Sequence, residues 1–407
     1  MAAVSVVEDA EGVLRLRIDN RQQEGSSATL LADARQALLP LLLHPAPRHA
    51  LFLGLGTGVT AASAAEDRRL EVDAVDLIPE VITASALFTS NFPKAGSEPR
   101  PKLMAADARR YVRATGSRYD LVVSDNFHPA RSGSGALYTV EHFRAVQARL
   151  APGGVFCQWL PLHQLDLPTL QSIVRSFIAV YPGGWAMLAT NSLDTPVLGL
   201  VARAGEPHFD LRLLRARLAS VDLRKPPGAF GIIDDLALLG GFVAGPAALK
   251  RFAGAAPLNT DDHPVVSYRA PHITYAPDSL PRDRLVKLLG ELSLEPRELL
   301  AEGFDAAWAA RLSAYWAARD QYLDVGRHVR LMADVRRMLA QAQAPLLSVL
   351  RLSPDFRPAY EPLLRMAAAL GRQDPAAARA LLAELMRLQP AWPEAAEVLR
   401  GLAARAP

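Results

Sequence analysis

The residues of this chain that could carry chemistry are three alternating glycines and the acids that follow them. Gly54, Gly56 and Gly58 stand directly after the apolar run at 50–53, and Asp76 follows one strand–helix–strand length later. Glycine permits a close backbone approach that a Cβ would block, and an acid at this distance can accept hydrogen bonds from a ribose. In the dinucleotide pattern the third glycine comes three residues after the second. The spacing here instead favours a nucleoside of the S-adenosylmethionine type.

Two further acids extend this candidate site. Asp107 can accept a hydrogen bond from an adenine amino group, or it can cap the helix that begins at Arg109. Asp125 ends the apolar strand Leu121–Ser124, with His128 three residues on. A carboxylate in that place can hold an amine or accept its proton, and an imidazole that titrates near neutrality can act as a base or a donor. The alternative interpretation of this pair is a loop-stabilising acid and a surface histidine.

Repeated strand-then-helix patterns must position these residues. From Leu51 to about Gly205 they predict a parallel sheet with helices on both faces, whose carboxyl edge collects the polar segments. The expected strands are Leu51–Leu53, Glu71–Asp76, Pro101–Met104, Leu121–Ser124, Gly154–Trp159, Trp185–Ala189 and Val197–Val201, the last two forming an antiparallel hairpin. We therefore predict an α/β fold with a Rossmann-like doubly wound sheet over residues 49–282.

Smaller parts flank this domain on both sides. Residues 1–48 predict a β-hairpin, which ends in a polar segment near residue 19, and then a lead-in helix over Leu30–Leu43. Residues 283–407 predict a helical domain, in which Leu350–Pro354 recurs as Met386–Pro390. That recurrence favours tetratricopeptide-like helix pairs, and a plain helical bundle is the alternative.

Composition narrows the class of protein. The 407 residues include 45 basic and 42 acidic ones, a balance too even to indicate a nucleic-acid partner. The single cysteine, Cys157, excludes an intramolecular disulfide and a cysteine-rich metal site, which fits a reducing compartment. We expect a cytoplasmic homo-oligomer, or the cytoplasmic part of a membrane-anchored protein, with no metal cofactor.

A series of motifs between residues 4 and 270 follows the order seen in a known enzyme family. The motifs are Asp19…Gln23, His44-Pro45-x-Pro47, the glycine turn, Asp76, Asp107, Tyr119-Asp120…Asp125-x-x-His128-Pro129, Leu137-Tyr138-Thr139-x-Glu141-His142-Phe143, Leu150-x-Pro152-Gly153-Gly154 and Gln158. In combination they resemble the polyamine aminopropyltransferases, the spermidine and spermine synthases. Gln158–Leu162 and Pro257–Pro264 look like the spermidine-synthase-like half of bacterial proteins that also carry a transporter-like membrane half.

The resemblance implies transfer of an aminopropyl group to a small-molecule amine, with release of methylthioadenosine. The co-substrate would be decarboxylated S-adenosylmethionine or S-adenosylmethionine itself. Asp125 would position and deprotonate the attacking amine, with His128 as a second candidate catalytic residue. The expected nucleoside-binding residues are Gln23, Gly54, Gly56, Thr57, Gly58, Asp76 and Asp107, and the expected amine-binding residues are Asp33, Tyr138 and Gln158.

Three acids of the family pattern are replaced here, by Thr57 in the glycine turn, by His128 and by Leu160. A polyamine carries two or more positive charges and needs carboxylates to replace its hydration, and Asp33 is the candidate replacement. The alternatives are therefore cleavage or cyclisation of S-adenosylmethionine, or methyl transfer, on the same fold. From another class, the chain could be a non-catalytic nucleoside-binding module whose C-terminal helices recruit a protein.

Overall fold

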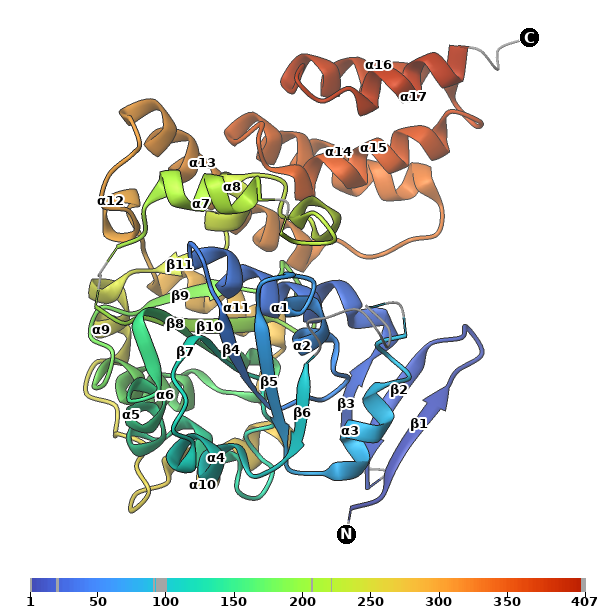
Figure 1. The fold of residues 1–407 in the computed structure, drawn as a ribbon. Coiled ribbons are helices and arrows are strands. Elements are labelled where there is room, and N and C mark those ends of the chain that lie inside the picture. Colours follow the sequence, from blue (N-terminus) through green and yellow to red (C-terminus); the bar gives the residue numbers. More distant parts are fainter. Residues whose placement is uncertain are drawn as a thin grey trace. The chain divides into compact units, whose positions relative to one another are not determined.

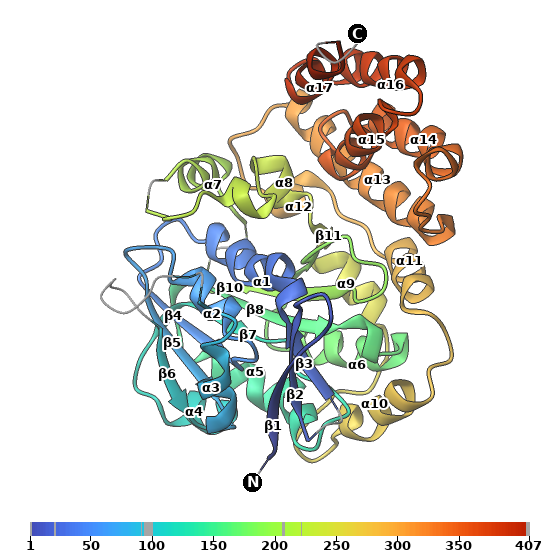
Figure 2. The same ribbon diagram turned by 90° about the vertical axis from the view of Figure 1, so that its right-hand side faces the viewer.

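The computed structural model describes residues 2–19, 22–90, 92, 101–205, 208–220 and 222–403. The chain divides into two compact units, Met1–Gly303 and Phe304–Pro407, which Figures 1 and 2 show from two directions. The division lies after Gly303, whereas the sequence-based boundary lies after residue 282. Helices α11 (Pro281–Glu291) and α12 (Pro296–Leu299) belong to the first unit.

The first unit is built on an eight-stranded sheet with the order β11-β9-β10-β8-β7-β4-β5-β6. The strands are β4 (His49–Leu53), β5 (Glu71–Asp76), β6 (Lys102–Ala105), β7 (Tyr119–Ser124), β8 (Leu150–Pro161), β9 (Trp185–Leu188), β10 (Val197–Arg203) and β11 (Phe242–Ala244). The five strands from β6 to β8 are parallel, and β10, β9 and β11 join antiparallel. The predicted doubly wound sheet and its antiparallel hairpin are therefore confirmed, and the three-residue strand β11 was not predicted.

Within the parallel part of the sheet, the direction in which successive strands are added changes once. The chain runs outward from β4 through β5 to β6, and then returns to place β7 on the other side of β4. At such a reversal the loops after the two central strands diverge and leave a crevice, where ligands bind in open α/β sheets. The glycine turn follows β4 and Asp125 follows β7, so both lie at this crevice.

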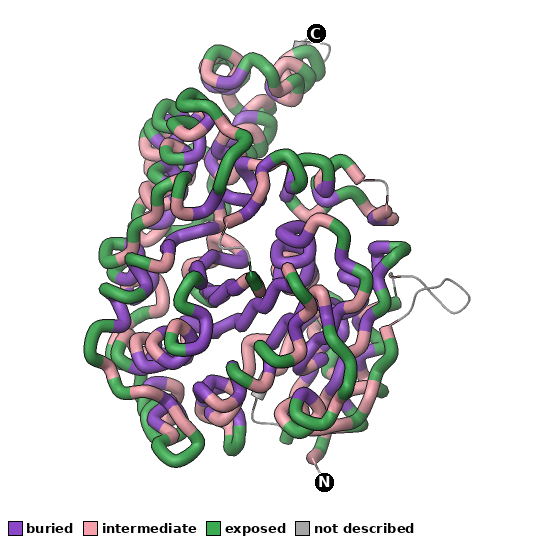
Figure 3. The backbone as a smooth tube through the Cα atoms, turned by 60° about the vertical axis from the view of Figure 1, so that its left-hand side comes forward, coloured by how far each residue is buried: buried purple, intermediate pink, exposed green. Residues whose placement is uncertain are grey.

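Side chains alternate along each strand, so apolar residues point to both faces of the sheet. Helices cover both faces and bury these residues. On one face of β8, Phe156 packs with Phe143 of α5 (Val140–Gln147) and Phe177 of α6 (Leu167–Ile178), at ring separations of 6.1 and 6.2 Å. On the other face, Trp159 Nε1 donates a hydrogen bond of 2.9 Å to the carbonyl of Gln36 in α1 (Leu30–Leu43). The bounds predicted for α1 are those observed. Figure 3 shows the buried residues gathered along these central strands.

The remaining helices of the first unit connect the strands or follow them. They are α2 (Val59–Ala64), α3 (Pro79–Ser85), α4 (Ala108–Ala114), α7 (Leu211–Leu218), α8 (Asp235–Leu239), α9 (Pro246–Ala253) and α10 (Val265–Tyr275). Among the described residues, none of the helices combines the length and the apolar character that crossing a membrane requires.

The N-terminal segment forms a three-stranded antiparallel sheet, where the sequence predicted a hairpin. Its strands are β1 (Val4–Glu8), β2 (Leu14–Ile18) and β3 (Gln22–Ser26). The predicted hairpin is present as β1 and β2, and the polar segment after it forms the third strand, which the sequence did not predict because it lacks the alternation of apolar residues that reveals a half-buried strand. Leu16 and Ile18 of β2 pack against Val59, Val81 and Phe88, which fixes this small sheet to α2 and α3.

The second unit contains five helices within the described residues, and neighbours in sequence pack side by side. They are α13 (Ala306–His328), α14 (Val335–Leu352), α15 (Arg357–Leu370), α16 (Pro375–Leu388) and α17 (Glu394–Ala403). The two copies of the repeated motif close α14 and α16, and they contact each other through a 3.1 Å hydrogen bond from Gln389 Nε2 to the carbonyl of Pro354. The tetratricopeptide-like assignment stays a prediction.

Candidate active site

A cavity of about 810 Å³ opens at the crevice between β4 and β7. Its walls come from the glycine turn, from α1, from the ends of β5 and β7, and from the segment after β7. It brings together seven of the residues singled out in the sequence, namely Asp33, Gly54, Gly56, Asp76, Asp107, Asp125 and His128. Thr57, Gly58, Tyr138 and Gln158 are not among the described residues that line it.

The glycine turn needs glycine for both conformation and space. Gly54, Gly56 and Gly58 have φ angles of +89°, +50° and +77°, a region that other residues rarely adopt. A Cβ on Gly54 would lie 2.8 Å from Cε1 of Phe127 and 3.0 Å from Cβ of Asp125. The turn therefore lets the loop after β7 come into direct contact with the loop after β4.

Asp76 ties the ends of β4 and β5 together. Its Oδ2 accepts a hydrogen bond of 3.1 Å from the Leu55 amide, and its Oδ1 accepts one of 2.9 Å from the Ile78 amide. The carboxylate also lines the cavity, so a ligand there would meet an acid whose orientation is already fixed.

Asp107 is the N-cap of α4. Its Oδ1 accepts a hydrogen bond of 2.8 Å from the Arg110 amide, the capping role that the sequence allowed. Because the same residue lines the cavity, capping and contact with a nucleoside are compatible.

Asp125 is the acid at the centre of the crevice. Its Oδ1 accepts a hydrogen bond of 2.8 Å from the Asn126 amide. Removal from water raises the pKa of Asp125 to about 6, and the charges of Glu24 and Asp76 add to this, while the Asn126 hydrogen bond and His128 oppose it. A carboxyl group that exchanges its proton near neutrality suits acid–base chemistry.

Asp33 lies close to the place where the family pattern has an acid and this chain has Thr57. Asp33 Oδ2 accepts hydrogen bonds from Thr57 Oγ1 at 3.5 Å and from Thr29 Oγ1 at 3.1 Å. Burial and the charge of Asp125 raise the pKa of Asp33 to about 7, and the two threonine hydrogen bonds oppose this. Helix α1 therefore brings a carboxyl group beside the glycine turn, within electrostatic range of Asp125.

His128 belongs to a polar group that the sequence reading only partly found. Its Nδ1 lies 2.8 Å from Gln164 Oε1, and its Nε2 lies 3.7 Å from Glu24 Oε2. Arg131 Nη1 donates to Glu24 Oε1 at 3.1 Å. Glu24, Arg131 and Gln164 all line the cavity and were not predicted as site residues. Glu24 stands on the unpredicted strand β3, so the sequence carried no signal for it.

Tyr138 and Gln158 were predicted to bind the amine. In the structure both donate hydrogen bonds to the backbone of the loop after β7. The Tyr138 hydroxyl donates a hydrogen bond of 2.7 Å to the carbonyl of Phe127, and Gln158 Nε2 donates one of 3.3 Å to the carbonyl of Asp125. Both side chains are fully buried. The side chain of Gln23 lies outside the described part of the chain, and its backbone pairs with Arg17 in the N-terminal sheet.

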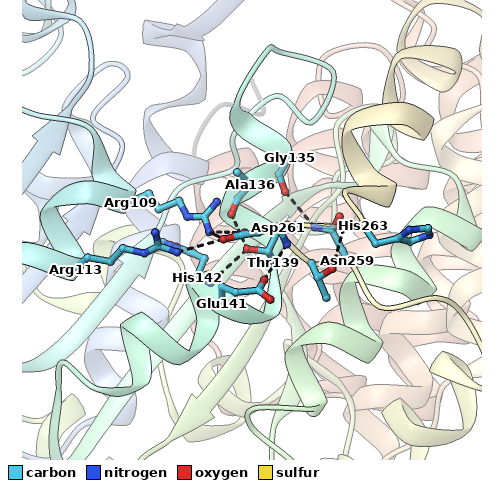
Figure 4. A network of polar contacts seen from close by, with 11 residues as sticks. Arg109, Arg113, Gly135, Ala136, Thr139, Glu141, His142, Asn259, Asp261 and His263 are labelled. Atoms are coloured by element: carbon cyan, nitrogen blue, oxygen red, sulfur yellow. Dashed lines mark hydrogen bonds and ion pairs between the residues drawn. The ribbon is translucent and has the colours of Figure 1, made fainter.

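The polar motif Pro257–Pro264 anchors the glycine-rich segment that borders the cavity (Figure 4). Buried Asn259 donates from Nδ2 to the carbonyl of Gly135 at 3.1 Å, and its Oδ1 accepts from the Val266 amide at 3.1 Å. Asp261 forms an ion pair with Arg109, which also lines the cavity. The 3₁₀ helix η2 (Ser134–Tyr138) is therefore held by a motif far away in sequence. Within the described ranges, no group of three or more His, Cys, Asp or Glu side chains could hold a metal ion.

Part of this chain is similar to known proteins. Residues 36–186 match the spermine/spermidine synthase domain. Polyamine aminopropyltransferase 2 of Hyperthermus butylicus is 30% identical over 177 residues, which cover 38% of this chain and 56% of that protein. The polyamine aminopropyltransferase of a Synechococcus species is 29% identical over 240 residues, which cover 53% and 73%. Spermidine synthase of Dictyostelium discoideum is 26% identical over 145 residues, which cover 35% and 51%.

The match to these curated relatives is partial, since the chain spans little more than half the length of two of the three. A solved structure of spermidine synthase in complex with the transition state analogue AdoDATO superposes with a TM-score of 0.51 at 21% identity. The superposition covers 62% of this chain and 85% of that one, and it shows that the fold is shared.

Proposed function

Because residues 36–186 match the spermine/spermidine synthase domain and the curated relatives are named polyamine aminopropyltransferases, we propose that this chain transfers an aminopropyl group from decarboxylated S-adenosylmethionine to an amine. The observation that carries the proposal is the pair of acids at the glycine turn. Asp33 and Asp125 line the same cavity. Burial raises the pKa of both acids, the charge of Asp125 further raises that of Asp33, and the charges of Glu24 and Asp76 further raise that of Asp125. Such a pair is poised to receive positively charged or proton-donating nitrogen atoms.

In the proposed reaction the amine nitrogen attacks the aminopropyl carbon next to the sulfonium. A carbon–nitrogen bond forms, the carbon–sulfur bond breaks, and its electron pair stays on sulfur, which leaves as methylthioadenosine. The proton lost by the nitrogen passes to Asp125, which is largely ionised at neutral pH because its pKa is about 6. Since the sulfonium is already activated, the protein mainly aligns the two reactants and removes this proton.

The remaining cavity residues divide between the two reactants. In this proposal Gly54 and Gly56 allow the nucleoside to approach the backbone, and Asp76 and Asp107, which line the same cavity, bind its ribose and adenine. Asp33 holds an ammonium group beside the glycine turn. It thereby takes over from the acid that the family pattern has at the position of Thr57.

Product analysis tests this proposal against its alternatives. The protein is incubated with decarboxylated or intact S-adenosylmethionine, with and without a panel of primary amines, and the products are identified by mass spectrometry. The proposal expects methylthioadenosine from the decarboxylated co-substrate only when an amine is present. Methylthioadenosine without an amine would indicate cleavage, adenosylhomocysteine would indicate methyl transfer, and binding without any turnover would favour the non-catalytic module.

A further inference from the structure

The carboxylates around the cavity differ in whether they are free to meet a substrate nitrogen. Asp76 accepts hydrogen bonds from two backbone amides, and Asp107 caps α4. Both stand at the ends of β5 and β6, on the side of the crevice assigned above to the nucleoside. Glu24 is already compensated, because Arg131 donates to it at 3.1 Å and His128 lies 3.7 Å away.

Asp33 and Asp125 remain for substrate nitrogens. Unlike Asp76, which accepts on both carboxylate oxygens, Asp33 accepts its two threonine hydrogen bonds on Oδ2, and Asp125 accepts the Asn126 amide on Oδ1. Aminopropyl transfer itself brings two nitrogen atoms to this place, the terminal ammonium of the donor and the attacking amine of the acceptor. Each can be assigned one carboxylate, with Asp33 beside the glycine turn and Asp125 at the end of β7. A second ammonium on the acceptor would need a further acid.

The opposite side of the cavity offers no such acid among its described lining residues. By the strand order, the edge formed by β8, β10 and β9 lies across the crevice from β5 and β6. The residues that line the cavity there are Pro161, His163, Gln164, Ala189, Thr190, Ser192, Thr195 and Val197. Burial, His128 and Arg284 lower the pKa of His163 to about 4, so this imidazole is neutral at neutral pH.

This wall is built for hydrogen bonds to an uncharged group. The loop between β9 and β10 presents a row of hydroxyl groups, in which Ser192 Oγ lies 3.2 Å from Thr195 Oγ1 and the Ser192 amide donates to Thr190 Oγ1 at 3.3 Å. Gln164 adds an amide whose Oε1 meets His128 and whose Nε2 lies 3.1 Å from His163 Nε2. Beside the buried Gln164, an ammonium would lose its hydration without gaining a counter-charge, which is far more costly than burying a hydroxyl that finds partners.

We propose that the acceptor of this protein carries one amine, which binds at Asp125, and an uncharged hydrogen-bonding group at its far end, as in an amino alcohol. The acceptor of a polyamine synthase instead has a second ammonium at that end. The proposal rests on the aminopropyl transfer proposed above. It accounts for the replacement of family acids by His128 and Leu160, because an acceptor with one charge does not need them.

An acceptor series of matched length tests the proposal on the full chain. Methylthioadenosine release from decarboxylated S-adenosylmethionine is measured with 4-aminobutan-1-ol, 1,4-diaminobutane and 4-aminobutanoate. We expect kcat/KM for the amino alcohol to exceed that for the diamine by about tenfold or more, the scale expected when a buried charge lacks a partner. Equal or better use of the diamine would overturn the proposal, as would a preference for the amino acid. If none of the amines supports methylthioadenosine release, aminopropyl transfer itself is wrong.

The second test places a charge at Thr190, on the side of the cavity opposite β5 and β6. Thr190→Asp keeps an oxygen that can accept from the Ser192 amide and adds the missing carboxylate, while Thr190→Asn keeps the acceptor without the charge. We expect the Asp variant to shift the ratio of kcat/KM values about tenfold towards the diamine, mainly through KM, and the Asn variant to leave this ratio near that of the unmodified protein. An Asp variant that does not move the ratio, or an Asn variant that moves it as far, would contradict the proposal.

Discussion

At the scale of single residues, the central feature is the contact between Thr57 and Asp33. The resemblance to the aminopropyltransferases implied that the acid of the glycine turn is replaced by Thr57 and that Asp33 is a candidate substitute, because both follow from comparing residue types with the family pattern. That Thr57 donates to Asp33 depends on how α1 packs against the turn, and no local pattern reports such a contact. For the same reason Glu24 escaped prediction, since its place in the cavity follows from the N-terminal sheet.

Asp125→Asn is expected to lower kcat by about 10²- to 10⁴-fold, the usual contribution of a positioned general base. The asparagine keeps an oxygen that can accept from the Asn126 amide, so the loop after β7 should hold its shape. Affinity for methylthioadenosine, measured by calorimetry, is expected to stay within a few fold. A matching loss of nucleoside binding would show that Asp125 serves the nucleoside and not the amine.

Asp33→Asn is expected to stabilise the unliganded protein above neutral pH while it impairs turnover. In the fold the pKa of Asp33 is raised from 3.8 to about 7, so ionisation destabilises the native state. This penalty is absent below about pH 4, grows between the two pKa values and is complete above about pH 7. Thermal unfolding should therefore show a higher Tm for the variant at pH 8, by a few degrees, and a difference that vanishes towards pH 4. A Tm difference independent of pH would contradict the assignment.

At the scale of secondary structure elements, the parallel core was predictable and the edges were not. Apolar runs between glycine, proline and polar segments revealed β4, β7 and β8, since a strand buried on both faces is largely apolar. Strand β11 has only three residues, and β3 is polar, so each lacks a periodic signal. The partner of the Pro257–Pro264 motif was likewise hidden, because the two segments are far apart in sequence and meet only in the folded chain.

Asn259→Ala is expected to loosen η2 and to destabilise the protein. The substitution leaves the Val266 amide and the Gly135 carbonyl without their buried partner, which costs roughly 1–3 kcal/mol for each unsatisfied group. Urea unfolding should report the loss, and hydrogen exchange should rise in residues 133–138. Asp262→Ala, at an exposed neighbouring position, is the matched control. Equal effects of the two substitutions would argue against an anchoring role for Asn259.

At the scale of the whole molecule, the cavity belongs to one of the two compact units. All of its described lining residues lie between Ile18 and Val197, within Met1–Gly303. The sequence separated a helical tail from the sheet domain because its apolar periodicity changes there. It could not assign α11 and α12 to the first unit, since a helix in either unit has the same amphipathic pattern. The role of the second unit, including the predicted docking of a protein, stays a prediction, as does the homo-oligomeric state.

Truncation after Gly303 is expected to leave methylthioadenosine release within a few fold of that of the full chain. Truncation after residue 282, the boundary predicted from sequence, removes the buried Leu285 and Leu288 and the 3.0 Å hydrogen bond from Arg284 Nη2 to the carbonyl of His163. This shorter chain should unfold at a clearly lower temperature in calorimetry. If the longer truncation product loses activity while it stays folded, the second unit contributes to the site.

The most direct measurement of the central claim is the dependence of methylthioadenosine release from decarboxylated S-adenosylmethionine on added amine, followed together with the alkylated amine by mass spectrometry. The account predicts that the two products appear in equal amounts, that neither forms without an amine, and that Asp125→Asn slows the formation of both by about 10²- to 10⁴-fold. Methylthioadenosine that accumulates at the same rate without an amine would contradict it.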